Sequence, residues 1–215
     1  MTNNPFTHLS QEHYADPKKS GLSDETIIGA GFKSVYPRDI NKIFGYETYA
    51  KSMYEIPYPG TDYSRYKMFY DEADKINLKT GDERPKYLAK KDSGNRLYIP
   101  TKVRAILKDL SIPLYITEGE KKSLKACQEG LYCIAISGLW NWKVKDQDGL
   151  IPDFDQIALG GRTVYLVPDN DFKKPDSKGR PRNLRQAVHE LAYELIGRGA
   201  KVLIVLLPEE SEANK

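Results

Sequence analysis

The sequence predicts an α/β protein: a Rossmann-like parallel sheet flanked by helices, preceded by an N-terminal α+β extension. From residue 111 onward, short apolar runs alternate strictly with helix-like segments, and this alternation is typical of parallel strands joined by crossovers. Before residue 111, short strands and short helices are separated by turn-rich segments. We therefore divide the chain into the extension, residues 1–110, and the sheet domain, residues 111–215.

In the extension, residues 1–20 are polar and predict a loop or a docked tail. A first helix is expected to begin at a Ser23 cap and to stop at Gly29 or Gly31, and a second to run from Pro37 to Gly45. The highly charged stretch 72–95 predicts an exposed excursion. Strands are expected at 54–58, 66–71 and 96–99.

In the sheet domain, glycines mark the ends of the helices that alternate with the strands. Gly130 ends one predicted helix, and Gly197 and Gly199 end another. The helices are expected at 121–129 and 184–197. The strands are expected at 113–117, 132–136, 163–167 and 201–207.

Composition favours a cytoplasmic protein without a membrane partner. The chain has 215 residues, of which 40% are hydrophobic, and no apolar run approaches the length of a membrane span. The N-terminus lacks the basic and apolar segments of a secretion signal. Its two cysteines are too few and too differently placed for a disulfide scaffold, so we expect buried, reduced thiols.

The net charge of +3 does not by itself indicate nucleic acid, but its distribution is uneven. Residues 1–110 hold 18 basic and 15 acidic residues, and 11 of the 15 tyrosines. Tyrosines interleaved with Lys and Arg are able to stack bases beside bound phosphates. The alternative is that they simply pack a small sheet. The tyrosines in question include Tyr46, Tyr49, Tyr54, Tyr58, Tyr63, Tyr66 and Tyr70.

Two strand-like runs end on carboxylates. One run ends in Glu-Gly-Glu and the other in Asp-Asn-Asp. Because parallel strands deliver ligands at their carboxyl ends, we expect Glu118, Glu120, Asp169 and Asp171 to converge at one rim. Clustered carboxylates without Cys or His favour a hard cation, here Mg²⁺ or Mn²⁺, and Mg²⁺ most often works on phosphates.

Gly119 supports this interpretation, since a residue without a side chain leaves room for a phosphate to approach the backbone. The helix that begins there would favour an anion at its first turn. Asp169 and Asp171 flank Asn170 and face one side of an extended segment. The alternative is that Glu118 and Glu120 are helix-cap acids and that Pro-Asp-Asn-Asp is an ordinary turn.

A basic stretch follows the acidic pair immediately. Residues 172–185 hold six basic residues and one acid, with Gly and two Pro that indicate a loop. Such a loop is either a solvated surface or a phosphate contact beside the metal. The candidates for phosphate contact are Lys173, Lys174, Lys178, Arg180, Arg182 and Arg185.

These residues also carry a family resemblance. Glu118-Gly119-Glu120, Ser137-Gly138, Asp169-Asn170-Asp171 and the closing Val-Leu-Ile-Val-Leu-Leu-Pro look like a Toprim core, the metal-binding domain of primases, topoisomerases and some nucleases. More closely, the chain resembles the Toprim-like domain of unknown function in primase-helicase proteins of phages, plasmids and integrated elements. That similarity extends to Ser20–Thr26, Asn95–Pro100, Thr117–Lys122 and Ser137–Trp142.

The resemblance implies that Glu118 is the Toprim glutamate and that Asp169 and Asp171 are its Asp-x-Asp pair, acting as catalytic and metal-binding residues. Replicative relatives usually carry an aspartate where this sequence has Lys122. We therefore expect Lys121 and Lys122 to contact a nucleotide phosphate. Relatives also continue beyond the last strand, often into a helicase, so the sheet domain is expected to be truncated or to stand alone.

Two hypotheses of different classes remain open. The first is a Mg²⁺-dependent primase-type nucleotidyltransferase that acts on single-stranded DNA or RNA with nucleoside triphosphates, served by a linked or separate helicase. The second is a non-catalytic Toprim-shaped module that binds single-stranded nucleic acid. A Toprim nuclease would use the same carboxylates.

Overall fold

The computed structural model describes residues 8–144, 149–169 and 184–208. It divides into an N-terminal unit, Met1–Gly94, and a C-terminal unit, Asn95–Lys215. Residues 95–110, which the sequence analysis assigned to the extension, lie in the C-terminal unit. The reason is that Leu97, Val103 and Leu107 join the hydrophobic core of that unit.

The N-terminal unit is an antiparallel sheet with helices, as the α+β prediction requires. Its strands lie in the order β1-β2-β3-β4. The strands are β1 (Lys33–Val35), β2 (Ser52–Pro57), β3 (Ser64–Phe69) and β4 (Tyr87–Ala89), and the helices are α1 (Gln11–Lys19), α2 (Asp24–Ala30), α3 (Pro37–Phe44) and the short η1 (Glu72–Asp74).

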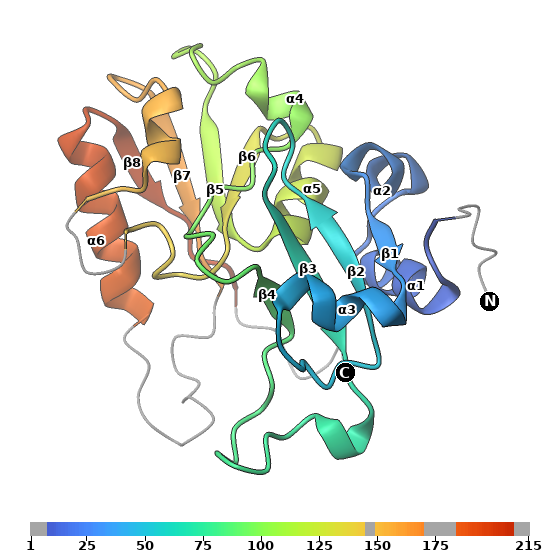
Figure 1. Cartoon of the computed structure of the whole chain (residues 1–215). Helices are drawn as coiled ribbons and strands as arrows, with labels where there is room; N and C mark the ends of the chain where they lie inside the picture. The colour runs from blue at the N-terminus through green and yellow to red at the C-terminus, as the bar shows by residue number, and fades with distance from the viewer. Residues whose placement is uncertain (1–7, 145–148, 170–183, 209–215) are drawn as a thin grey trace. The chain divides into compact units, whose positions relative to one another are not determined.

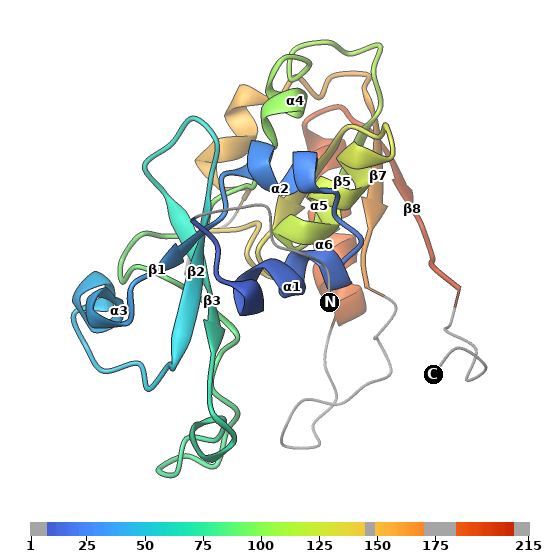
Figure 2. The same ribbon diagram turned by 90° about the vertical axis from the view of Figure 1, so that its right-hand side faces the viewer.

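Alternation along β2 places α3 and α1 on opposite faces of this sheet (Figure 2). Met53 packs with Ile40 and Phe44 of α3. The next residue, Tyr54, points the other way, and its hydroxyl donates to Asp16 of α1 over 2.6 Å. Four of the tyrosines singled out above are buried, as the packing interpretation requires: Tyr54, Tyr58, Tyr63 and Tyr66.

The first helix corrects the expectation of a loop before residue 20. Ser10 caps α1 by accepting from the amide of His13 over 3.2 Å. The buried side of α1 consists of His13, Tyr14 and Pro17. Because none of these is Leu, Ile, Val or Met, the apolar periodicity that usually identifies a helix is missing from the sequence.

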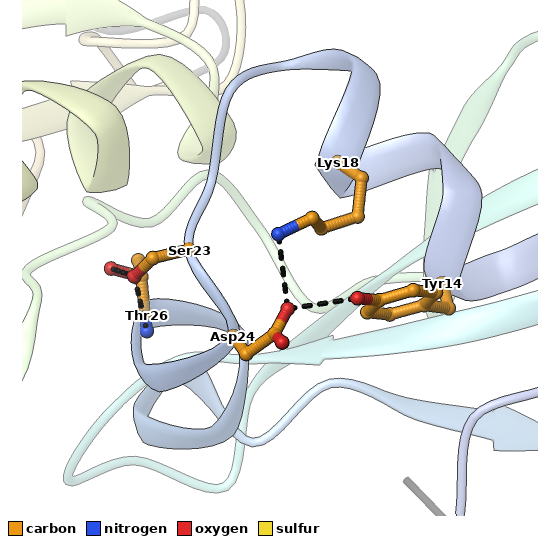
Figure 3. Close-up of polar contacts among 5 residues, drawn as sticks. All are labelled: Tyr14, Lys18, Ser23, Asp24 and Thr26. Carbon is orange, nitrogen blue, oxygen red and sulfur yellow. Dashed lines mark hydrogen bonds and ion pairs between the residues drawn. The ribbon is translucent and has the colours of Figure 1, made fainter. Parts of the chain in front are cut away.

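Asp24 at the start of α2 joins the first two helices, as Figure 3 shows. It accepts from the Tyr14 hydroxyl over 2.9 Å and from the Lys18 ammonium over 3.0 Å. These bonds, with Lys18 the larger influence, hold the pKa of Asp24 below its usual value. Ser23 caps α2 and Gly31 ends it in the left-handed conformation, which confirms the helix predicted there.

The C-terminal unit confirms the predicted parallel sheet flanked by helices (Figure 1). Its strands lie in the order β6-β5-β7-β8. The strands are β5 (Leu114–Glu118), β6 (Cys133–Ile136), β7 (Thr163–Val167) and β8 (Lys201–Ile204), and the helices are α4 (Thr101–Arg104), α5 (Glu120–Gln128), η2 (Pro152–Gln156) and α6 (Leu184–Gly197). The expected strand at 96–99 is instead a single bridge between Tyr98 and Ala135.

The core of this unit is aliphatic and continuous. Ile116, Ile134 and Val164 come from three adjacent strands, and Ala187 and Leu195 from α6. Both cysteine thiols are buried and free, and burial raises the pKa of Cys133 to about 12. Among the residues that the structure describes, no helix has both the length and the apolar character needed to cross a membrane.

Arg162, just before β7, is the largest side chain without solvent exposure. Its guanidinium donates to the carbonyl oxygens of Ile112 at 2.9 Å, Leu107 at 3.0 Å and Ile106 at 3.2 Å. Desolvation lowers the pKa of this group, and the negative charge of Asp109 opposes that shift. Arg162 thereby fastens the segment before β5 to the start of β7.

Replacing Arg162 with Leu is expected to lower the free energy of unfolding of the C-terminal unit by about 3–5 kcal/mol, because buried carbonyls lose their donor. Both tryptophans, Trp140 and Trp142, lie in this unit, so urea unfolding followed by tryptophan fluorescence reports on it. Arg198→Leu removes an exposed pair with Asp155 and serves as the control, with an expected loss below about 1 kcal/mol. Equal losses in the two variants would contradict the role of Arg162.

His13 is buried between two serines of the N-terminal sheet. Its Nε2 lies 3.0 Å from Ser52 Oγ and its Nδ1 lies 2.6 Å from Ser34 Oγ. Since the Ser52 hydroxyl donates to Glu12, Ser52 accepts from Nε2–H, and the neutral ring fits both contacts. Burial lowers the pKa of His13, against the opposing charges of Glu12 and Asp16.

The N-terminal unit is therefore expected to lose stability as the pH falls below 6.5, the ordinary histidine pKa. In that range the unfolded chain binds a proton that the folded ring resists. Hydrogen exchange of β2 peptides between pH 7.5 and 5.5, corrected for intrinsic exchange rates, measures the effect. His13→Gln should flatten this dependence and His8→Gln, at an exposed position, should leave it intact. If His8→Gln flattened the pH dependence and His13→Gln did not, His13 would not be its cause.

Candidate functional site

The strand order of the C-terminal unit creates a switch point beside β5. From β5 the chain proceeds to β6 on one side, and it then returns to β7 on the other side of β5. In open α/β sheets, ligands bind at the carboxyl ends of the strands where the order reverses in this way. Glu118 is the last residue of β5, and Asp169 follows β7 by two positions. The pairing of Thr117 with Val167 places both at the same edge.

Gly119 turns the chain from β5 into α5. Its φ of +91° lies where residues with a side chain are strained, and its amide donates to the Ile136 carbonyl over 2.9 Å. A Cβ atom built here would meet no other atom within 4 Å. Glycine is thus required by the backbone conformation, and the space in front of it is open. No side chain of the described residues caps α5.

Glu120 does not join the rim, contrary to the expectation from its spacing. It lies in the first turn of α5 and is 3% exposed. Burial raises the pKa of Tyr98, and the negative charge of Glu120 raises it further. The carboxylate therefore faces the interior of the unit, because the first turn of a helix rotates successive side chains by about 100°.

The structure brings Lys122 and Asp169 together. The Lys122 ammonium, in the first turn of α5, forms an ion pair with Asp169 Oδ1, just after β7. The two side chains are 52% and 35% exposed. The sequence analysis assigned Lys122 to a nucleotide phosphate, and the structure shows its carboxylate partner within the protein. Residues 47 positions apart carry no local signal of such pairing.

The other predicted phosphate contacts are only partly placed. Lys121 is half-buried on α5 and Arg185 is exposed in the first turn of α6. The remaining predicted residues lie outside the described ranges, and their roles stay predictions. They are Asp171, Lys173, Lys174, Lys178, Arg180 and Arg182.

Below the carboxylates, a small crevice opens between the strand ends and α6. It is lined mainly by apolar side chains, among them Ile136, Leu139 and Val188. Its polar lining residues are Thr117 and the rim residue Glu118. The Thr117 hydroxyl donates to the Val167 carbonyl over 3.0 Å, which ties β5 to β7.

The donor chemistry of the rim fits a hard cation in part. Mg²⁺ usually binds through one or two carboxylates together with water and substrate phosphates, and Glu118 and Asp169 supply two carboxylates from adjacent strand ends. Within the described ranges, no group of three or more His, Cys, Asp or Glu side chains is placed to hold a metal. A cation at Asp169 must also displace the Lys122 ammonium.

Comparison with known proteins identifies a protein family and solved structures of similar fold. Residues 103–214 match the family described as "Domain of unknown function (DUF3854)". The crystal structure of the Aquifex aeolicus primase, comprising its zinc-binding and RNA polymerase domains, has a TM-score of 0.59 and a sequence identity of 16%. The similarity covers 94% of this chain and 51% of that chain, so this chain spans about half its length. At such identity the likeness concerns the fold. No curated protein matches the sequence.

Removing the lysine should improve cation binding at the rim. Lys122→Met is expected to tighten Mn²⁺ binding about threefold to fivefold, because a competing ion pair worth at most about 1 kcal/mol is lost. Calorimetric titration with Mn²⁺ measures this. Lys125→Met is the matched control, since Lys125 pairs with Glu129 on the same helix and should leave the affinity unchanged. A similar affinity in both variants would refute competition at Asp169.

Proposed function

The chain belongs to the family described as "Domain of unknown function (DUF3854)", and from its fold and strand-end site we propose that it is a primase-type domain that processes nucleic acid by Mg²⁺-dependent nucleotidyl transfer. The observation that carries this proposal is the position of Glu118 and Asp169 on either side of the switch point. Carboxylates at that position, beside a lysine and an open backbone turn, suit a triphosphate. The likeness to a primase fold supports the same class of reaction.

In the proposed reaction, Glu118 and Asp169 would hold Mg²⁺, with Asp171 as the further carboxylate expected from the sequence. When bound, Mg²⁺ would neutralise charge on the phosphoryl group being transferred. Lys122 would exchange its bond to Asp169 for one to a phosphate oxygen, since an ammonium is a mobile point charge on a flexible stem. Gly119 leaves the space in front of the turn open for that phosphate.

The ion pair itself favours a second candidate, a non-catalytic module that binds single-stranded nucleic acid. With Lys122 bound to Asp169, one carboxylate is neutralised by the protein. A site balanced in this way repels phosphate less than bare carboxylates would. A nuclease using the same carboxylates is the further outcome that the experiment below separates.

The proposed setting is a replication protein of a phage, plasmid or integrated element. Its proposed substrates are single-stranded DNA and nucleoside triphosphates, and its proposed partner is a linked or separate helicase. This setting rests on the sequence motifs that resemble those of the family, among them Ser20–Thr26 and Ser137–Trp142.

Primer synthesis on a single-stranded DNA template, with Mg²⁺ or Mn²⁺ and labelled nucleotides, tests the proposal. Wild type should synthesise primers, and Asp169→Asn should lose at least about a hundredfold in rate, because a ligand of the Mg²⁺ that would stabilise the transition-state charge is removed. Asp153→Asn is a control within the same unit, since Asp153 holds the Leu97 amide. Unchanged synthesis by Asp169→Asn would overturn the assignment of this residue.

The remaining outcomes separate the alternatives. If the wild-type protein binds the template but synthesises no primer, the result would contradict the enzymatic proposal and favour the non-catalytic binding module. If the wild-type protein cleaves a labelled strand without nucleotides and Asp169→Asn does not, the result would favour a nuclease over a nucleotidyltransferase.

A further inference from the structure

The N-terminal unit contains a cavity of about 560 Å³ that the proposed site does not use. It lies between the end of β3 and residues 72–86, which belong to the stretch 72–95 that was predicted to be an exposed excursion. We call it the β3 groove, and its charged and aromatic lining comprises Lys67, Phe69, Tyr70, Glu72, Lys75, Glu83, Arg84 and Lys86. Its volume lies within the range of about 300–1,000 Å³ that is typical of small-molecule sites.

The β3 groove carries a net positive charge. Four of its lining residues are basic and two, Glu72 and Glu83, are acidic. One of those acids forms an ion pair with Lys75. The positive charge of the groove therefore rests mainly on Lys67, Arg84 and Lys86, on the β3 side and along the returning segment. This balance suits an anionic ligand.

Aromatic rings lie beside these cations. The Arg84 guanidinium lies 4.1 Å from the ring centroid of Tyr49, and the Lys67 ammonium lies 4.7 Å from that of Tyr87. The Arg65 guanidinium also contacts this ring, at 5.2 Å from the Tyr87 centroid. A cation-aromatic stripe thus continues from the groove across β3 and β4, which lengthens the surface available to a chain-like anion.

Two tyrosines that are not fully buried belong to this region. The half-buried Tyr70 lines the groove, and its hydroxyl donates to the Pro85 carbonyl over 3.1 Å. Tyr49 is 45% exposed and has a φ of +60°, an unusual conformation for a bulky residue. The backbone is strained at the residue that presents a ring to Arg84.

We propose that the β3 groove binds single-stranded nucleic acid, with a base stacked on Tyr70 and phosphates held by Lys67, Arg84 and Lys86. Exposed rings interleaved with cations are the means by which proteins hold single strands without reading their sequence. The choice of nucleic acid as the anion rests on the proposed function. The groove itself belongs to the other unit and contains none of the rim residues.

Fluorescence anisotropy with a labelled twelve-nucleotide oligothymidylate tests the proposal on the full chain. Lys67→Ala/Lys86→Ala should weaken binding about tenfold or more and should reduce the slope of log affinity against log salt by about 1.4, or 0.7 for each phosphate contact. The charge-matched control is Lys33→Ala/Lys42→Ala. Lys33 on β1 pairs with Glu55, and Lys42 on α3 pairs with Asp39. This control should change affinity less than twofold. Equal losses of affinity in the two double variants would contradict the proposal that the β3 groove binds the oligonucleotide.

Stacking is tested separately. Tyr70→Leu should weaken binding about fivefold or more, whereas Tyr70→Phe, which keeps the ring, should stay within about twofold. Equal effects of Leu and Phe would refute stacking on Tyr70. Circular dichroism spectra that match wild type establish that each variant is folded, and Lys86→Glu repeats the charge test at a single exposed position.

Two further measurements keep this proposal distinct from the proposed function. If an acidic peptide of the same net charge competes with oligothymidylate as well as unlabelled oligothymidylate does, the ligand of the groove would be an acidic protein segment and not nucleic acid. Primer synthesis at saturating template depends on the rim and not on the groove. If Lys67→Ala/Lys86→Ala binds oligothymidylate like wild type while synthesis persists, the groove proposal alone fails. If binding falls as expected while wild type makes no primer, the enzymatic proposal alone fails.

Discussion

The C-terminal unit depends on one buried cation. Arg162 reaches back to carbonyls of residues 106–112, just before β5, from a position directly before β7. Its own carbonyl accepts from the Lys201 amide at the start of β8. The amino ends of three neighbouring strands are therefore connected through one residue, by its side chain and its backbone carbonyl. Because the strands are rigid and short, fixing their starts also sets where their carboxyl ends meet, and Glu118 and Asp169 lie there.

Most of the elements in this unit could be predicted from the sequence, since each apolar run is short and ends at a glycine or a carboxylate. What could not be predicted was the partner of each polar side chain. Glu120 is separated from Glu118 by one residue, yet the start of α5 turns it inward. Arg162 reads as an ordinary charged residue in a turn, and only the three-dimensional structure shows the carbonyls around it.

The N-terminal unit illustrates the opposite difficulty. Helix α1 was missed because its buried side is polar and aromatic, and the signal that identifies helices is aliphatic periodicity. The tyrosines divide by position on the sheet. Tyr54 and Tyr66 pack into the interior from β2 and β3, while Tyr49 precedes β2 and Tyr70 follows β3. A count of tyrosines cannot separate these groups, whereas strand boundaries and register do.

The order β6-β5-β7-β8 also has a consequence for how the rim forms as the chain folds. Strands β5 and β6 are joined by α5 and are close together in the sequence. Strand β7 is farther along the chain, so a long loop must close before it reaches the free side of β5. Until β7 docks, Lys122 and Asp169 belong to separate parts of an unfinished sheet. Their ion pair is therefore a marker of completed assembly, present only in molecules whose central strand has gained both neighbours.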